Sequence, residues 1–374
     1  MLVAALASVL TFGLTAMDGA SPEQSKLEEL AGLIDERFIA ESDPTHMYDA
    51  AAAGMVASLG DRWSHYISAD DYALYEAQMK NAYVGVGITI TQREDGYLDI
   101  VKVTPGGPAE AAGALAGDIL RAVDGTDCAG LGLDGTRNLV GGEEGTTVRL
   151  TVLRGEEEVT LEIERAFFEV PVVESRLIDG NVGYVKILNF DDRCADETIA
   201  AIEARIAEGA EMILFDVRNN PGGYQHELVE VLDYLLPEGP LFRSEYYDGK
   251  TRVDESDADF LDLPMAVLVN GESYSAAEFF AAALRDYEVA PVIGEKTVGK
   301  GYFQQTFRLS DGSAVGLSVG KYFTPKGEHL AGIGLEPDVS VEVDEETFRE
   351  IYLGTVDPME DPQILAAINV LKTP

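Results

Sequence analysis

The stretch from residue 167 to 345 constrains the fold most, because apolar runs alternate there with amphipathic segments. Runs such as EMILFDVRNN and PMAVLVN have the length and composition of buried strands, whereas DETIAAIEARIAEGA and SAAEFFAAALRDY have helical periodicity. Strands that alternate with helices predict a mainly parallel sheet covered by helices. Ligands bind such sheets at the carboxyl ends of the strands, so we expect any active site in the loops there.

The regions on either side have different patterns. Residues 21–81 predict helices, and residues 82–166 predict short alternating strands with Gly, Pro and Asp turns and two short helices. Residues 346–374 close the chain with a helical segment. The predicted organisation is therefore a helical N-terminal region, a compact inserted module, an α/β domain over 167–345 and a C-terminal helical segment.

The first seventeen residues, MLVAALASVLTFGLTAM, contain no charged side chain. Such a segment has the right length for the apolar core of a signal peptide and is short for a membrane span. Residues 1–20 are therefore predicted to be a signal peptide or a membrane anchor, with an apolar first helix of the fold as the alternative. The prediction implies an extracytoplasmic protein, secreted or anchored outside the cytoplasmic membrane.

Charge and cysteine content exclude several classes of protein. With 27 basic and 67 acidic residues the net charge is −40, which argues against nucleic acid as a partner because phosphate binding needs clustered Lys and Arg. Cys128 and Cys194 lie far apart and form no metal-ligand spacing. We expect no metal and no cofactor, and the sequence leaves open whether the two thiols are free.

The most informative loop of the inserted module is Gly85-Val86-Gly87-Ile88. Two glycines let successive N–H groups turn outward and hold a carboxylate, although most turns of this kind are only turns. The segment VTPGGPAEAAGALAGDILRAVDG, which follows, resembles the central stretch of a PDZ domain. PDZ domains add the free carboxyl end of a peptide as a strand beside a helix, so the loop is a candidate carboxylate site.

Two strand-to-helix junctions are candidates for chemistry. DVRNNPGG follows the strand MILF, and its Gly222 and Gly223 could expose N–H groups at a helix start to stabilise an oxyanion; a plain tight loop is the alternative. VLVNGESYSAAEFFAAAL places Ser275 where a buried strand meets a helix, which suits a nucleophile. Ser275-x-x-Glu278 is also a capping box, so the hydroxyl could instead cap the helix.

Lys300 is the candidate base for Ser275. None of the four histidines (His46, His65, His226 and His329) lies in a motif that marks a triad base. Lys300 lies between Gly299 and Gly301 directly after a predicted strand, where burial could lower its pKa enough for the neutral amine to take a proton. The alternative is an ordinary solvated lysine.

From about residue 25 to its end, the chain resembles the carboxyl-terminal processing peptidases, also called tail-specific proteases. That family has a serine segment followed by a Gly-Lys-Gly segment with a glutamine four residues after the lysine, which correspond here to SYSAAE, VGKGYFQ and Gln304. Lys300 follows Ser275 by 25 residues, as in the family. Further family-like segments appear in order: GMVASLGDRWSHY, DVRNNPGG, LSDGSAVGLSVGKYFTPKG, GIGLEPD and DPQILAAINVL. Tyr274 and Ala277 depart from the family's usual alanine and serine.

The resemblance implies an α/β core of the ClpP/crotonase type over 167–345, with a PDZ domain at 82–166 inserted after the helical region 21–81. It implies that Ser275 is the nucleophile, Lys300 the general base and Gln304 the residue that orients the lysine. The oxyanion hole would be formed by backbone N–H groups at Gly222, Gly223 and Ala276, and the loop from Gly85 to Ile88 would bind the substrate carboxylate.

The implied function is a serine endopeptidase for proteins or peptides with apolar carboxyl-terminal tails. A membrane tether through the N-terminus and a homodimer stay open. The alternatives are a catalytically silent PDZ-bearing scaffold and an acyl-CoA enzyme of the crotonase fold. Both Ser275 and Lys300 are present, which argues against the first, and a PDZ insertion argues against the second.

Overall fold

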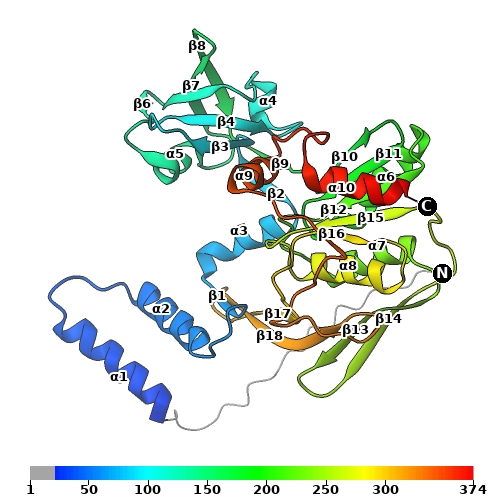
Figure 1. Ribbon diagram of the computed structural model, residues 1–374. Coiled ribbons are helices and arrows are strands. Elements are labelled where there is room, and N and C mark those ends of the chain that lie inside the picture. The colour runs from blue at the N-terminus through cyan, green and yellow to red at the C-terminus, as the bar shows by residue number, and fades with distance from the viewer. Residues whose placement is uncertain (1–21, 374) are drawn as a thin grey trace, which may run out of the picture.

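The computed structural model describes residues 22–373. The predicted signal peptide or anchor, residues 1–20, lies outside the described residues. Within them, no helix combines the length and apolar character that a membrane crossing requires. The chain forms three parts, which are an N-terminal helical region, a PDZ module and an α/β core (Figure 1).

The α/β core is built on a six-stranded sheet with the order β10-β11-β12-β15-β16-β19. β10 is antiparallel to β11, and every following pair is parallel, as the alternation of strands and helices predicts. The strands are β10 (Val173–Ile178), β11 (Val182–Ile187), β12 (Met212–Asp216), β15 (Met265–Val269), β16 (Val292–Gly294) and β19 (Val339–Ser340).

Helices cover both faces of this sheet because successive side chains of a strand point to opposite faces. Ile213 and Phe215 of β12 pack with α6 (Cys194–Ala207), α7 (Gln225–Leu235) and α8 (Ala276–Asp286). Leu214, between them, packs on the other face with α10 (Pro362–Lys372). α9 (Glu345–Leu353) precedes α10. The sheet is thus buried on both sides, and its strand ends carry the loops of interest.

A second, five-stranded sheet borders the first and was not predicted. Its order is β1-β18-β13-β14, with β17 also paired to β18. The short strand β1, from the N-terminal region, pairs antiparallel with β18, so that His65 lies opposite Gly316. This pairing places residues 61–64 beside the part of the chain that contains Lys300. The strands are β1 (His65–Ile67), β13 (Gly239–Tyr246), β14 (Thr251–Ser256), β17 (Tyr302–Arg308) and β18 (Ala314–Phe323).

The PDZ module has a hydrophobic core of its own, formed by aliphatic side chains such as Leu98, Ile100, Leu120 and Leu150. Its sheet has the order β3-β4-β5-β7-β8, with β6 paired to β5. The antiparallel pair β2-β9 forms its connection to the rest of the chain. The elements are β2 (Ala82–Gly85), β3 (Ile88–Gln92), β4 (Leu98–Val103), α4 (Pro108–Ala111), β5 (Ile119–Val123), β6 (Thr126–Asp127), α5 (Gly132–Val140), β7 (Thr147–Arg154), β8 (Glu157–Glu164) and β9 (Ala166–Glu169).

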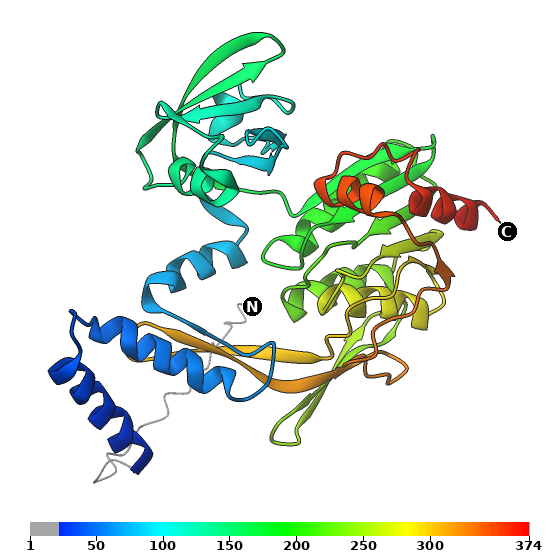
Figure 2. The ribbon, with the colours of Figure 1, turned by 60° about the vertical axis from the view of Figure 1, so that its left-hand side comes forward.

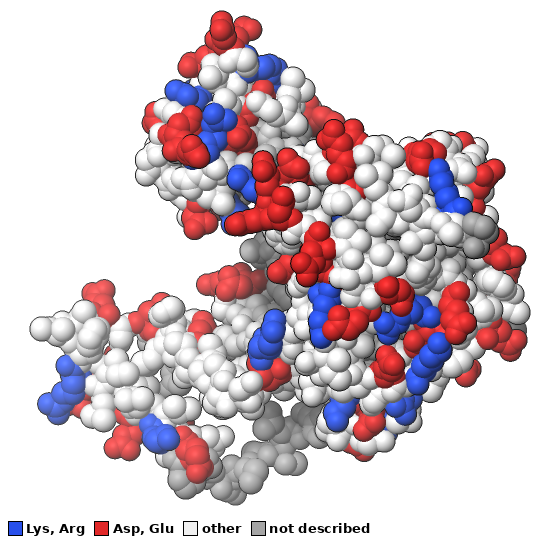
Figure 3. All heavy atoms as spheres, in the orientation of Figure 1, with Lys and Arg blue, Asp and Glu red and all other residues white. Residues whose placement is uncertain are grey.

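The N-terminal helices extend away from the core (Figure 2). They are α1 (Pro22–Arg37) and α2 (Pro44–Ala57), and α3 (Ala69–Met79) then leads into β2. Several of their apolar side chains are exposed, among them Leu30, Leu33 and Met55. Acidic side chains are spread over all three parts on the face seen in Figure 3, as the net charge of −40 requires. Cys128 and Cys194 are free and buried in separate cores.

Candidate active site

One cleft of about 770 Å³ brings most of the predicted catalytic residues together. It is lined by Ser275, Lys300 and Gln304 and by the loop that contains Gly222 and Gly223. These residues come from three separate loops at strand ends of the core and from β17. Their meeting is the arrangement that the sequence predicted for the carboxyl ends of a parallel sheet.

Ser275 lies on the tight turn between β15 and α8. Its backbone angles are φ 60° and ψ −124°, a conformation that is rare for a residue with a side chain. Such strain occurs at functional sites, and nucleophilic serines are presented on strained strand-to-helix turns of this kind. The predicted capping box with Glu278 is also present. However, the Glu278 N–H donates to the Ser275 carbonyl oxygen at 3.0 Å, so the helix end does not depend on the hydroxyl.

Gly222 and Gly223 occupy positions where a side chain would not fit. A Cβ on Gly222 would lie 2.6 Å from Ser275 Cβ, and one on Gly223 would lie 2.3 Å from the Phe190 carbonyl carbon. Both have positive φ, of 90° and 151°. The Gly222 N–H donates to Asn220 Oδ1 at 2.8 Å, so this predicted oxyanion donor already has a partner here. Ala276, as the first residue of α8, has no N–H partner within its own helix.

Glu278 joins the nucleophile loop to the lysine loop. Its carboxylate is fully buried, and Oε2 accepts the N–H of Ser275 at 3.0 Å and of Lys300 at 2.8 Å. Oε1 accepts the Gly299 N–H at 2.7 Å and the Thr297 hydroxyl. Burial raises the pKa of Glu278, and these hydrogen bonds oppose that rise. One side chain therefore fixes the backbone positions of both predicted catalytic residues.

Lys300 is half-buried in the cleft. Burial lowers its pKa to about 8, against the opposing charges of Asp61 and Glu278, and Arg62 adds to the lowering. Its Nζ lies 4.7 Å from the centre of the Trp63 ring and 5.7 Å from that of Tyr274. Between residues 22 and 373, Lys300 Nζ has no hydrogen-bond or ion-pair partner, Ser275 included. A lysine with this pKa supplies neutral amine near neutral pH.

Gln304 lies in the same cleft on β17 but does not contact the lysine in this structure. Its Nε2 donates to Ser318 Oγ at 3.0 Å and to the Tyr302 carbonyl oxygen at 3.2 Å. Ser318 belongs to β18, and its N–H donates to Ser64 Oγ at 3.1 Å. Gln304 is thereby connected to the segment that carries Asp61 and Trp63, and its role toward Lys300 stays a prediction.

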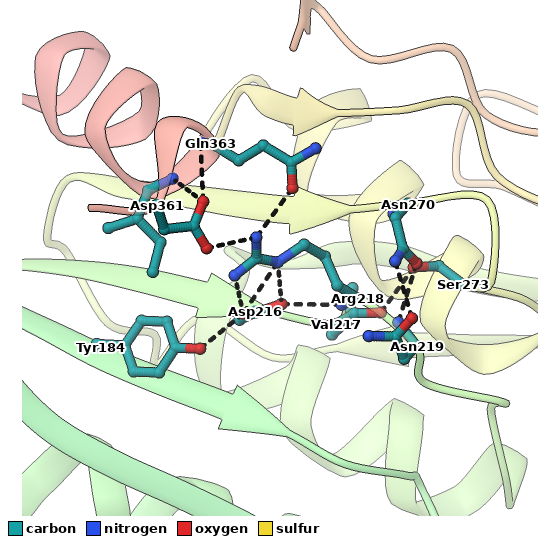
Figure 4. A network of polar contacts seen from close by, with 10 residues as sticks. Tyr184, Asp216, Val217, Arg218, Asn219, Asn270, Ser273, Asp361 and Gln363 are labelled. Atoms are coloured by element: carbon teal, nitrogen blue, oxygen red, sulfur yellow. Dashed lines mark hydrogen bonds and ion pairs between the residues drawn. The ribbon is translucent and has the colours of Figure 1, made fainter. Parts of the chain in front are cut away.

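The loop with the two glycines is anchored from behind by a buried ionic network (Figure 4). Arg218 is paired with Asp216 at 2.6 Å and with Asp361, just before α10, at 2.7 Å. Burial opposes the charge of Asp216, but the charge and hydrogen bonds of Arg218 outweigh it and hold the pKa of Asp216 at about 2. Next to this network, the side-chain amides of Asn219 and Asn270 bond each other at 2.9 Å. The network fixes the loop from β12 to α7 against α10.

The predicted carboxylate-binding loop of the PDZ module lies between β2 and β3. The carbonyl oxygens of Val86 and Gly87 accept the N–H groups of Ala109 (2.7 Å) and Thr104 (2.9 Å). These two carbonyl oxygens are thus already hydrogen-bonded within the PDZ module. Whether the N–H groups bind a carboxylate stays a prediction.

One group within the described part of the chain has metal-ligand geometry. The ligand atoms of Asp192, His226 and Glu227 lie within 4.8 Å of one another. Glu227 Oε2 already accepts the N–H of Ala195 at 2.7 Å in the first turn of α6. Glu227 therefore has a structural role as a cap of α6.

Comparisons with known proteins assign this site to a family. The model of "Peptidase family S41" matches residues 181–341, which include Ser275 and Lys300, and a PDZ domain model matches residues 100–154. "Carboxy-terminal processing protease CtpA" of Bacillus subtilis is 31% identical over 355 residues, which cover 92% of this chain and 76% of that protein. The chain belongs to peptidase family S41. The predicted resemblance is thereby confirmed.

Another relative is the "Probable CtpA-like serine protease" of Staphylococcus haemolyticus, with 34% identity over 324 residues and 85% of this chain. The chain spans 65% of the length of that relative. The structure named "Photosystem II D1 C-terminal processing protease" has 27% identity and a TM-score of 0.52, and covers 86% of this chain and 94% of its own. A Bacteroides fragilis structure described as an S41 protease has 18% identity and a TM-score of 0.62. The predicted fold class, a ClpP/crotonase-like core with a PDZ insertion and a helical N-terminal region, is confirmed.

Two features of the site were missed by sequence reasoning. Glu278 was identified only as a local cap, although it also accepts hydrogen bonds from residues 297–300. Trp63 and Asp61 lie in GDRWSHY, which was noted only as a loose match to the family pattern. A contact between this segment and Lys300 depends on the pairing of β1 with β18, for which the sequence carries no local signal.

Proposed function

We propose that this S41 family member is a serine endopeptidase that captures the carboxyl-terminal tail of a protein and cleaves it through an acyl-enzyme. One observation carries the proposal. Ser275, on its strained turn, and Lys300, with a pKa lowered to about 8, line the same cleft as the two-glycine loop. A serine needs an adjacent base to act as a nucleophile, and a desolvated lysine can be that base.

In the proposed mechanism, the neutral Lys300 amine accepts the hydroxyl proton as Ser275 Oγ attacks the scissile carbonyl carbon. The backbone N–H groups of Gly223 and Ala276 would stabilise the oxyanion, and Gly222 would allow the close approach of the loop. Collapse of the tetrahedral intermediate breaks the C–N bond, and the Lys300 ammonium returns its proton to the leaving amine. Water then hydrolyses the ester by the same route and regenerates Ser275. Gln304 would orient the lysine once substrate is bound.

The PDZ module would supply the recognition of the tail. In the proposal, the loop from Gly85 to Ile88 binds the terminal carboxylate, and an apolar tail adds as a strand beside β3. α5 packs beside β3, as this mode of peptide binding requires. The preferred substrates are proteins or peptides with apolar, unstructured tails.

The proposal also covers location and assembly. Residues 1–20 would export the protein, as a cleaved signal peptide or as a tether, to the outside of the cytoplasmic membrane. Exposed apolar side chains on α1 and α2, such as Leu30 and Met55, would support a homodimer. Cell fractionation tests the location. Sedimentation of wild type and of a variant with both side chains changed to Ser tests the dimer.

The activity is tested with an unfolded reporter protein that ends in an apolar tail. Wild type is compared with Ser275→Ala and Lys300→Ala, and each is offered the reporter with a free and with an amidated carboxyl terminus. We expect cleavage by wild type alone, and slower cleavage of the amidated reporter. If the variants cut as fast as wild type, the assignment of Ser275 and Lys300 is wrong.

The alternative is a catalytically silent scaffold that uses its PDZ module to bind partners. The PDZ module has a hydrophobic core of its own, which would let it bind a partner even if the α/β core were inactive. Under this alternative, wild type and Ser275→Ala would bind the free-tailed reporter equally and neither would cut it.

A further inference from the structure

The Lys300 amine contacts two aromatic rings and makes no hydrogen bond to Ser275 within the described residues. Nζ lies 4.7 Å from the centre of the Trp63 ring and 5.7 Å from that of Tyr274, and the two ring centres are 5.6 Å apart. Both distances from Nζ are within the range at which a cation is attracted to the face of a ring, and tryptophan is the best such partner. A neutral amine gains no comparable attraction.

The backbone of Trp63 is held on both sides by hydrogen bonds. The Trp63 N–H donates to Asp61 Oδ1 at 3.2 Å, and the Trp63 carbonyl oxygen contacts His65 Nδ1 at 3.1 Å. Immediately after this turn, β1 pairs with β18. The ring, which is half-buried, thus extends from an anchored turn and packs beside Tyr274 and Lys300.

The charged groups around Lys300 have opposing effects on its pKa. Asp61 and Glu278 favour its ammonium form, whereas burial and Arg62 disfavour it. The Arg62 guanidinium carbon also lies 4.2 Å from the Trp63 ring centre, so the two cations share this ring. Burial raises the pKa of Tyr274, and the charge of Glu272 adds to the rise against that of Arg62, so the phenol stays neutral.

We propose that Trp63, backed by Tyr274, is a positioning residue that binds the protonated Lys300 amine on its ring face and keeps it from Ser275 until the amine loses its proton. The ring would thus hold the base in a resting position and release only the form that can accept the serine proton. The inference rests on the proposed function, in which Lys300 is the base.

The first test is the pH dependence of kcat/KM for reporter cleavage, which reports ionisations of the free enzyme. Trp63→Leu keeps an apolar wall but removes the ring attraction, so the ammonium form loses stability. We expect the acid limb to move to lower pH by roughly 0.5 to 1.5 units, the range implied by cation–π energies. Trp63→Phe, which keeps a ring face, should move it less. An acid limb that stays in place or moves to higher pH in Trp63→Leu overturns the proposal.

A second measurement needs no peptidase activity. In full-length Ser275→Ala protein, the rate at which a small acylating reagent modifies the Lys300 amine is followed against pH by peptide mass spectrometry. The exposed Lys80 in the same cleft serves as the reference. We expect the pH at which Lys300 reaches half its maximal acylation rate to fall when Trp63→Leu is added. An unchanged or higher midpoint contradicts the inference. If wild type cleaves nothing but this midpoint falls, the peptidase proposal fails while the role of the ring stands.

Discussion

The α/β core and the PDZ module are both packed around apolar side chains, but they place their charged groups differently. The core buries Asp216, Arg218 and Glu278 completely or nearly so and satisfies them with hydrogen bonds to the loops of the cleft. The PDZ module also buries Asp118 and Arg165, but its other charged pairs, such as Arg149 with Glu162, lie on the surface. Buried polar groups constrain geometry strongly because each must keep its partners. The comparison indicates that the core fixes the loops of its cleft through buried polar contacts, whereas the module is packed mainly through its apolar side chains.

The largest expected effect comes from removing the charge behind the two-glycine loop. Arg218→Met leaves Asp216 and Asp361 buried without their partner, and breaking a buried pair in this way costs about 3–5 kcal/mol of unfolding free energy. Arg149→Met in the PDZ module breaks an exposed pair and should cost less than about 1 kcal/mol. Urea unfolding of both variants measures the difference. Equal losses would remove the contrast between the two regions.

Glu278→Gln tests the carboxylate that joins the two catalytic loops. Glutamine has nearly the same shape, but one of its two end atoms is an amide nitrogen, which cannot accept. Either the bonds from Ser275 and Lys300 or the bond from Gly299 are therefore lost. Since misplaced catalytic groups lose rate steeply, we expect kcat/KM to fall by roughly a hundredfold with the fold retained. Glu272→Gln, at an exposed position in the same loop, is the control and should cleave as wild type does. A Glu278→Gln enzyme with normal kcat/KM would show that the carboxylate is only a helix cap.

Much of the fold and of the site could be predicted from the sequence, but only where the sequence signal is local. The apolar runs that became β12 and β15 and the small-residue helix α8 each carry their own pattern, and the strand ends placed Ser275 and the two glycines together. The PDZ module was likewise visible from its turns and alternation. The five-stranded sheet was missed because β13, β17 and β18 have no buried run between helices to mark them.

The contacts that tune the site could not be predicted because they join distant parts of the chain. Asp61 and Trp63 reach Lys300 only through the pairing of β1 with β18. Glu278 has a complete local explanation as the N3 residue of a capping box, which concealed its hydrogen bonds to residues 299 and 300. Arg218 gave no sign that it would be buried, because its partner Asp361 follows far along the chain.

The pH dependence of kcat/KM for wild type tests whether the site in the α/β core uses Lys300 as its base. Lys300 must be neutral to accept a proton, and burial lowers its pKa to about 8. Below that pH the neutral fraction falls, so kcat/KM should fall about tenfold for each pH unit between 7 and 6 and level off above 8. Far-UV circular dichroism over the same range controls for unfolding, because the only tryptophan, Trp63, lies beside Lys300 itself. A profile that is flat down to pH 6 would exclude Lys300 as the base.

The smallest expected effect concerns one of the exposed ion pairs between the PDZ module and the core. Lys102 of β4 pairs with Glu174 of β10, and both side chains are more than two-fifths exposed. An exposed pair contributes at most about 1 kcal/mol and is screened by salt. Lys102→Ala should therefore speed amide hydrogen exchange in the β2-β9 connection only a few-fold at low salt, and added salt should produce the same change in wild type. Arg149→Ala, within the module, should leave that exchange unchanged. A much larger effect of Lys102→Ala would mean that this exposed pair fixes the module to the core, contrary to the contrast drawn between buried and exposed charges.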